Sequence, residues 1–102
     1  MITFIKPLKS MAEVILMQLS EDQYDQIIQS IAKKLKQARK ERKLTVLELS
    51  SRSGVADNHI SFIENGKRTK VSLKVYLKIC AGLNISPKEL LEDIDQFPPF
   101  DD

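Results

Sequence analysis

The side chains best suited to chemistry are gathered between residues 57 and 70. The first part of this stretch offers hydrogen-bond donors and acceptors beside one aromatic ring: Asp57, Asn58, His59, Ser61 and Phe62. Three cations follow closely: Lys67, Arg68 and Lys70. Side chains of these types can read polar base edges and hold phosphates. They do not suit catalysis, because His59 is the only histidine and no Ser/His/Asp or Gly-rich phosphate-binding arrangement accompanies it. We therefore expect no enzyme.

Cys80 is the only cysteine, so the chain cannot form an internal disulfide. No Cys-x-x-Cys pair suggests zinc, and we expect neither a metal nor another cofactor. Cys80 is interpreted as a buried thiol of an intracellular protein. The apolar run Val14–Met17 is too short for a signal peptide, and no stretch is long enough to span a membrane. We expect a cytoplasmic protein without a membrane partner.

The net charge of +2 hides an uneven distribution. Residues 1–30 carry two lysines and four acidic residues, and residues 85–102 carry one lysine and six acidic residues. Between them, residues 31–84 carry thirteen lysines or arginines against four acidic residues. A basic middle between acidic ends places a candidate polyanion site in the middle. A solvated helix face would give the same charge pattern, so charge alone does not decide.

Apolar spacing and capping residues predict five helices. The predicted helices lie at about 21–42, 45–53 and 57–65, and two more begin at Ser72 and Ser86. Ser20 with Gln23 forms a capping-box pattern for the first helix, which could break near Ser30. The fifth helix has Pro87 at its first position and apolar residues as far as Ile94. Before residue 20, two β-favouring runs could form a short hairpin.

The spacing from Thr45 to Lys67 carries the most information. Two short helices flank a turn at Gly54, and Val55, Ile60 and Ile63 are spaced to pack against Leu49. One face of the second helix is then left free, and a short exposed helix fits the major groove of DNA. Here the chain resembles the Cro and phage-repressor (XRE) helix-turn-helix family. The matching residues are Leu35, Arg39, Leu44-Thr45, Leu49, Gly54-Val55, Ile60, Glu64-Asn65-Gly66-Lys67, Leu77, Cys80-Ala81, Leu83-Asn84-Ile85-Ser86 and Leu90-Leu91.

The resemblance implies a mainly α fold, namely a five-helix lambda-repressor-like DNA-binding domain at residues 31–93. An N-terminal extension at 1–30 precedes the domain, and an acidic flexible tail at 94–102 follows it. The family implies a sequence-specific regulator of transcription, acting as a repressor, with the helix at about 57–65 in the major groove of double-stranded DNA. It also implies that Arg39 and Glu64 form a partly buried ion pair between the first and third helices.

Matched positions imply two sets of contacts. The candidates for base contact are Val46, Asp57, Asn58 and Phe62, with His59 and Ser61 as secondary candidates. The candidates for phosphate contact are Lys40, Lys43, Thr45, Arg52, Asn65, Lys67, Arg68 and Lys70. Three further lysines, at positions 33, 34 and 36, are expected to add only long-range attraction.

Three base-contact candidates depart from the family's usual residue types. Val46 replaces a polar residue, so it could at most touch a thymine methyl. Asp57 could accept a hydrogen bond from cytosine, or it could cap its helix, since Ala56 cannot. Phe62 could pack inward or against a methyl group. Asn58 is therefore the best candidate for direct reading.

Regulators of this kind bind two half-sites as dimers, so we expect a homodimer. Residues 1–30, with the Tyr24, Ile27 and Ile28 helix face, could supply the dimer contact or could fold back on their own core. The alternative function is a protein-interaction module. An antitoxin that binds a partner protein and autoregulates its operon, or a controller of a mobile element or restriction system, would suit the short chain.

Overall fold

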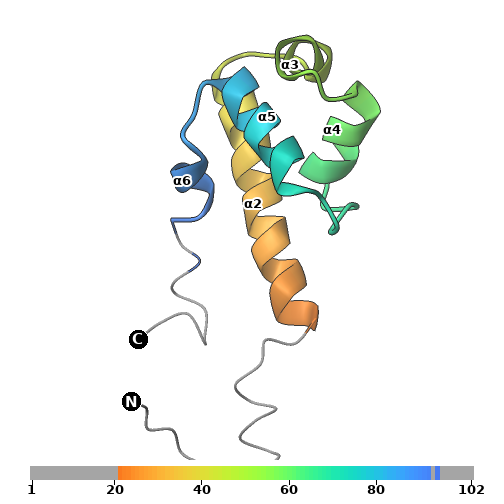
Figure 1. Cartoon of the computed structure of the whole chain (residues 1–102), viewed down its shortest axis with the longest axis vertical. Coiled ribbons are helices and arrows are strands. Elements are labelled where there is room, and N and C mark those ends of the chain that lie inside the picture. The colour runs from red at the N-terminus through yellow and green to blue at the C-terminus, as the bar shows by residue number, and fades with distance from the viewer. Residues whose placement is uncertain (1–20, 93, 95–102) are drawn as a thin grey trace, which may run out of the picture.

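The computed structural model describes residues 21–92 and 94, which form five α-helices and no strand (Figure 1). The helices are α2 (Glu21–Glu41), α3 (Val46–Ser53), α4 (Asp57–Glu64), α5 (Leu73–Leu83) and α6 (Pro87–Leu90). The predicted five-helix order is confirmed. The predicted hairpin, the Ser20 cap and nearly all of the predicted tail lie outside the described residues.

Two helices differ in extent from their predictions. α2 runs unbroken through Ser30 for 21 residues, so the predicted option of a break there is wrong. α6 ends at Leu90 after four residues, although the apolar pattern predicted a continuation to Ile94. The residues after Leu91 are Glu92 and Asp93, whose charges are unfavourable at the negative end of a helix dipole.

The hydrophobic core is built mainly by aliphatic side chains from all five described helices. Its fully buried members are Leu35, Leu49, Ile60, Ile63, Ile79, Cys80 and Leu83. α3 and α5 approach each other closely at Gly82, where an added Cβ would lie 3.0 Å from both Leu49 Cδ1 and Ser53 Cβ. Glycine is normally unfavourable in the interior of a helix. The structure shows that the small residue here allows the two helices to pack.

Side-chain caps mark the starts of α3 and α6. Thr45 and Glu48 form a reciprocal capping box at the start of α3, and Ser86 and Glu89 form a second one at α6. The backbone N–H of Thr45 donates to the Glu48 carboxylate at 2.8 Å and holds the pKa of Glu48 below its usual value. The stabilising charge of Glu48 is therefore present at neutral pH and is lost only as the pH falls through this lowered pKa.

Among the residues that the structure describes, four adopt left-handed backbone conformations at helix ends: Lys43, Gly54, Gly66 and Asn84. At the end of α2, the Lys43 N–H bonds to Lys40 O at 2.9 Å, and the Leu44 N–H bonds to Arg39 O at 3.1 Å. This pair of bonds is a Schellman motif, in which glycine is the preferred left-handed residue. Lys43 occupies that position with φ +56°. Its Cβ is then crowded against the backbone, which destabilises this conformation relative to glycine.

Replacing Lys43 by glycine should therefore stabilise the fold. We expect Lys43→Gly to raise the free energy of unfolding by about 0.5–1 kcal/mol, because relief of the left-handed strain exceeds the added freedom of the unfolded chain. Urea unfolding followed by circular dichroism measures this change. Lys43→Ala is the control, since it removes the same charge and keeps the strain. Equal stability of the two variants would contradict the explanation.

Candidate nucleic-acid interface

A tight turn joins α3 to α4 and fixes the angle between them. Gly54 has φ +75°, and its N–H bonds to Ser50 O at 2.9 Å. Val55, directly after it, is buried, and Ile60 and Ile63 of α4 are also buried in the core. With these three residues packed inward, the opposite face of α4 is left at the surface. The predicted pair of crossed helices is confirmed.

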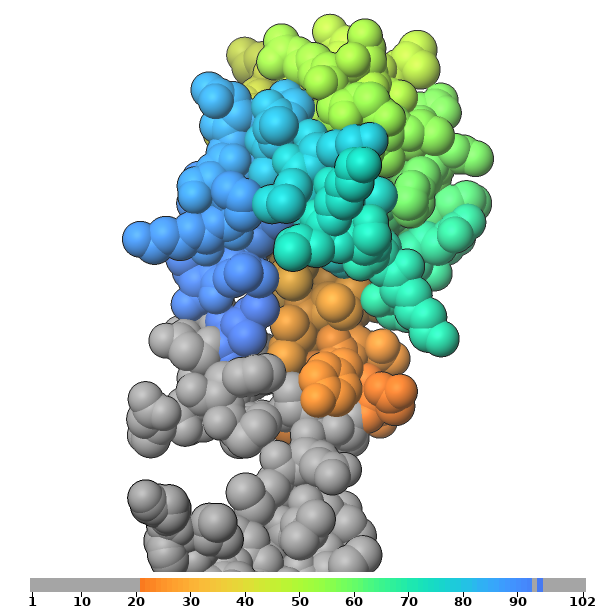
Figure 2. All heavy atoms as spheres, viewed as in Figure 1, coloured from red at the N-terminus to blue at the C-terminus, as the bar shows by residue number. Residues whose placement is uncertain are grey.

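The free face of α4 carries the predicted base-contact candidates. Asp57, Asn58 and Phe62 are exposed, and His59 and Ser61 are half-buried. Positions 57 and 61, and likewise 58 and 62, are one helical turn apart, so these side chains form one stripe. In Figure 2, α4 and the segment after it lie along one edge of the molecule, green to turquoise.

Asp57 takes part in the helix start without being its N-cap. Ala56 occupies the N-cap position and makes no side-chain hydrogen bond. Asp57 stands at the first helical position, where its Oδ1 accepts the Asn58 N–H at 2.8 Å. The carboxylate therefore satisfies one free N–H of the first turn and also suits the positive end of the helix dipole.

Two apolar residues at the start of α3 have opposite environments. Val46, a candidate for base contact, is half-buried and packs against the hydrophobic core. Its neighbour Leu47 is 68% exposed and was not singled out from the sequence. The packing gives Val46 a structural role beside any contact with a thymine methyl.

Phe62 neither packs fully inward nor stands alone. It is 38% exposed, and the Arg68 guanidinium lies over its ring at 5.2 Å from the centroid. The turn between them is another Schellman motif, in which the Gly66 N–H bonds to Ile63 O at 3.1 Å and the Lys67 N–H to Phe62 O at 2.9 Å. The turn brings a loop cation onto the exposed face of α4 as a cation–π pair.

The predicted ion pair between α2 and α4 is present. Arg39 Nε and Nη2 donate to the two carboxylate oxygens of Glu64 at 2.8 and 2.9 Å. Arg39 Nη1 also donates to Leu44 O at 2.8 Å. The Glu64 side chain is only 4% exposed, and its hydrogen bond raises the pKa of Arg39. Both charges are thus paired, and α4 is tied to α2 and to the segment before α3.

The candidates for phosphate contact are exposed, and they come from three parts of the fold. Lys67, Arg68 and Lys70 lie in the loop after α4, while Lys40 and Lys43 lie at or after the end of α2. Arg52 is in the last turn of α3. At the N-terminus of α3, the Thr45 hydroxyl oxygen accepts the Glu48 N–H at 3.0 Å, and its own O–H is left available to donate to a phosphate.

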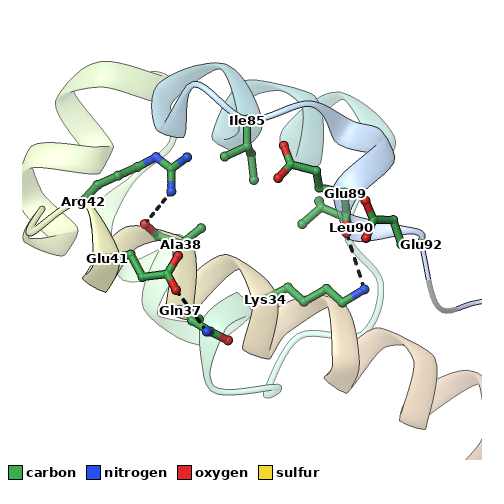
Figure 3. A pocket seen from close by; sticks show the side chains of 9 residues that line it. All are labelled: Lys34, Gln37, Ala38, Glu41, Arg42, Ile85, Glu89, Leu90 and Glu92. Atoms are coloured by element: carbon green, nitrogen blue, oxygen red, sulfur yellow. Dashed lines mark hydrogen bonds between the residues drawn. The ribbon is translucent and has the colours of Figure 1, made fainter.

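A hollow of about 220 Å³ lies between α2 and α6 (Figure 3). Its walls carry both signs of charge: Lys34 and Arg42 face Glu41, Glu89 and Glu92. The Lys34 ammonium donates to Glu89 O at 3.4 Å across it. In Figure 1, α6 and α4 lie on opposite sides of α2, so this hollow is separate from the free face of α4.

Other kinds of site are not found in the part of the chain that the structure describes. Within residues 21–92 and 94, no group of three or more His, Cys, Asp or Glu side chains is placed to hold a metal ion. None of the helices in the same part is long and apolar enough to cross a membrane.

Comparison with known proteins agrees with this geometry. A family model described as helix-turn-helix matches residues 35–90. The HTH-type transcriptional regulator SinR of Bacillus licheniformis is 35% identical over 66 residues, which are 65% of this chain and 60% of that protein. SinR of Bacillus subtilis (strain 168) is 35% identical over 63 residues, which are 62% and 57% of the two chains. The chain spans about three fifths of the length of these curated relatives.

The fold also has a solved counterpart. The crystal structure of the wild-type restriction-modification controller protein C.Esp1396I superposes with a TM-score of 0.60 and 24% identity, covering 70% of this chain and 96% of that one. At this identity the likeness shows the fold, which is lambda-repressor-like. Because the family model matches more than half of the residues, the chain belongs to the helix-turn-helix family, in its Cro and phage-repressor branch.

Proposed function

We propose that this protein is a cytoplasmic, sequence-specific DNA-binding regulator of transcription that acts as a repressor and places α4 in the major groove. The observation that carries the proposal is the exposed face of α4, together with the exposed cations of the segments before α3 and after α4. Asn58 is exposed on that face, and Lys43 and Lys67 lie to either side of α4 along the chain. Membership of the helix-turn-helix family supports the same function.

The exposed side chains of α4 suit particular base edges. The Asn58 amide can pair with the N6 and N7 atoms of adenine, and the free Phe62 ring edge can touch a thymine methyl. Asp57 can still accept from cytosine N4 with its second carboxylate oxygen, because only Oδ1 is hydrogen-bonded. α4 carries no lysine or arginine. Affinity should therefore come mainly from phosphate contacts outside α4.

Removing the Asn58 amide should weaken specific binding only. We expect Asn58→Ala to bind the preferred sequence about 5- to 150-fold more weakly, because a bidentate amide–adenine pair discriminates by about 1–3 kcal/mol. Binding to random DNA should not change. Mobility shifts with DNA selected by the wild-type protein from a random pool measure both affinities. An equal loss on both DNAs would contradict a base-reading role.

The loop cations should act on all sequences alike. Lys67→Ala combined with Arg68→Ala should weaken binding to preferred and random DNA by the same factor. It should also reduce the slope of log K against log salt by about 1.8, at about 0.9 for each phosphate contact. Titrations at four salt concentrations give the slope. A slope equal to that of the wild type would remove these two residues from the phosphate contacts.

We propose further that the protein binds as a homodimer, because one helix-turn-helix unit reads only a few base pairs. Ile27 is 7% exposed and belongs to the chain's own core, so it is not free to contact a partner. Tyr24 is 48% exposed, and Leu73, Leu77 and Leu91 are also exposed apolar residues. Sedimentation of a chain lacking residues 1–19 tests whether this part of the proposed extension at 1–30 dimerises the proposed domain at 31–93. An unchanged dimer would assign the contact to the described helices.

The alternative is a module that binds a partner protein and autoregulates its own operon, as an antitoxin does. The exposed face of α4 favours it in one respect, since that face carries an acidic residue and no cation. The products of neighbouring genes separate the two: a stable complex with one of them after co-expression would favour this alternative, and its absence would favour a regulator acting on its own.

A further inference from the structure

Two residues of α2, Gln29 and Lys36, contact the turn that follows α4. Gln29 Nε2 donates to the Gly66 carbonyl at 3.1 Å, and Lys36 Nζ donates to Asn65 Oδ1 at 3.3 Å. Gln29 and Lys36 are two helical turns apart and so lie on one side of α2. Gln29 precedes residues 35–90, which the family model covers. The Gln29 contact is therefore an addition to the family core.

Gly66 is suited to this contact in two ways. Its φ of +70° is the left-handed conformation that the turn requires. A Cβ at this position would overlap the Gln29 side-chain amide. The missing side chain thus lets Gln29 lie directly against the turn, and the turn cannot move toward α2 without displacing it.

The turn at Gly66, which Gln29 contacts, also sets the positions of the loop cations. The Lys67 N–H bonds to Phe62 O at 2.9 Å, and the next residue, Arg68, lies over the Phe62 ring. Asn65 is a candidate for phosphate contact. Its Oδ1 is occupied by Lys36, so its Nδ2 is the group left to donate outward.

We propose that Gln29 and Lys36 are positioning residues for the DNA-backbone contacts made by the turn and loop after α4. Gln29 fixes the turn at Gly66, and Lys36 orients the Asn65 amide so that its N–H groups face a phosphate. The proposal rests on the DNA-binding function proposed above. It assigns one side of α2, from Gln29 before the residues matched by the family model to Lys36 within them, to holding the loop that contacts the DNA backbone.

Two matched pairs of variants test the proposal. Gln29→Met removes the donor and keeps the length of the side chain, while Gln26→Met makes the same change at an exposed position three residues earlier. Lys36→Met and Lys33→Met each remove one positive charge from the same helix. We expect Gln29→Met and Lys36→Met to bind preferred and random DNA about 2- to 10-fold more weakly than their controls.

A second measurement does not depend on DNA. In Gln29→Met, the Lys67 amide should exchange with solvent faster than in Gln26→Met, because the turn that protects it is no longer braced. In Lys36→Met, the side-chain amide resonances of Asn65 should shift, and in Lys33→Met they should not. Global stability from urea unfolding should agree within each pair, which separates positioning from a general loss of fold.

The outcomes separate this inference from the proposed function. If the wild-type protein binds DNA and each variant matches its control in affinity and in the amide measurements, the positioning role is wrong and the function stands. If the wild-type protein binds no DNA, the proposed function and this inference both fail. Weaker binding with faster Lys67 exchange would support both.

Discussion

Replacing Arg39 by methionine is expected to lower the free energy of unfolding by about 3–5 kcal/mol. The change leaves the Glu64 carboxylate, whose side chain is 4% exposed, without its cation and without two hydrogen bonds. Removing one partner of a buried ion pair strands a charge in the interior, which is the source of this cost. The Leu44 carbonyl also loses its Arg39 donor. Because small domains are stable by only about 5–15 kcal/mol, this loss is a large part of the total.

Urea unfolding measures the loss, and two controls interpret it. Lys40→Met removes a positive charge from an exposed neighbour and should change stability by less than about 0.5 kcal/mol. The double variant Arg39→Met with Glu64→Met removes both charges and should recover most of the lost stability. If Arg39→Met alone stays within about 1 kcal/mol of the wild type, the pair does not hold the fold as described.

Truncating Leu49 to alanine should cost about 2–5 kcal/mol. Leu49 of α3 is fully buried, and its Cδ1 lies where α3 and α5 approach each other closely at Gly82. That close packing leaves little room for neighbours to fill the space vacated by the leucine. Thermal unfolding should show a drop of roughly 4–8 °C for each kcal/mol in a domain of this size.

Leu47→Ala is the matched control for this prediction. Leu47 is in the same helix, two residues away, and is 68% exposed, so its truncation should change stability by no more than about 0.5 kcal/mol. DNA binding by both variants, measured well below their unfolding temperatures, should stay close to that of the wild type. Equal destabilisation by the two truncations would show that α3 does not bury the face described.

The sequence was sufficient to predict those helix ends that depend on interactions between residues close together in the chain. The Thr45–Glu48 box, the Ser72 and Ser86 caps and the glycine ends of α3 and α4 act within a few residues, so residue type and spacing are sufficient. The apolar spacing likewise identified the buried face of α4. The Arg39–Glu64 pair spans two helices, and it could be predicted only through the family resemblance.

The remaining features depend on contacts between distant segments. Gln29 meets Gly66 across 37 residues, and no local pattern marks either as a partner of the other. Gly82 looks unfavourable within a helix, and its use becomes visible only once α3 is packed against α5. For Phe62, the sequence left inward packing open, because it does not show that the turn at Gly66 brings Arg68 over the ring.

The buried thiol of Cys80 can be used to measure how often the helices separate. Burial, helped by the charge of Glu89, raises the pKa of this thiol, so the reactive thiolate is scarce in the native state. The chain has no tryptophan to provide a fluorescence signal, but it has this single labelling site. The rate at which a disulfide reagent modifies Cys80 will therefore report how often the helices separate. A thiol count against time can rank destabilised variants under native conditions, without heat or denaturant.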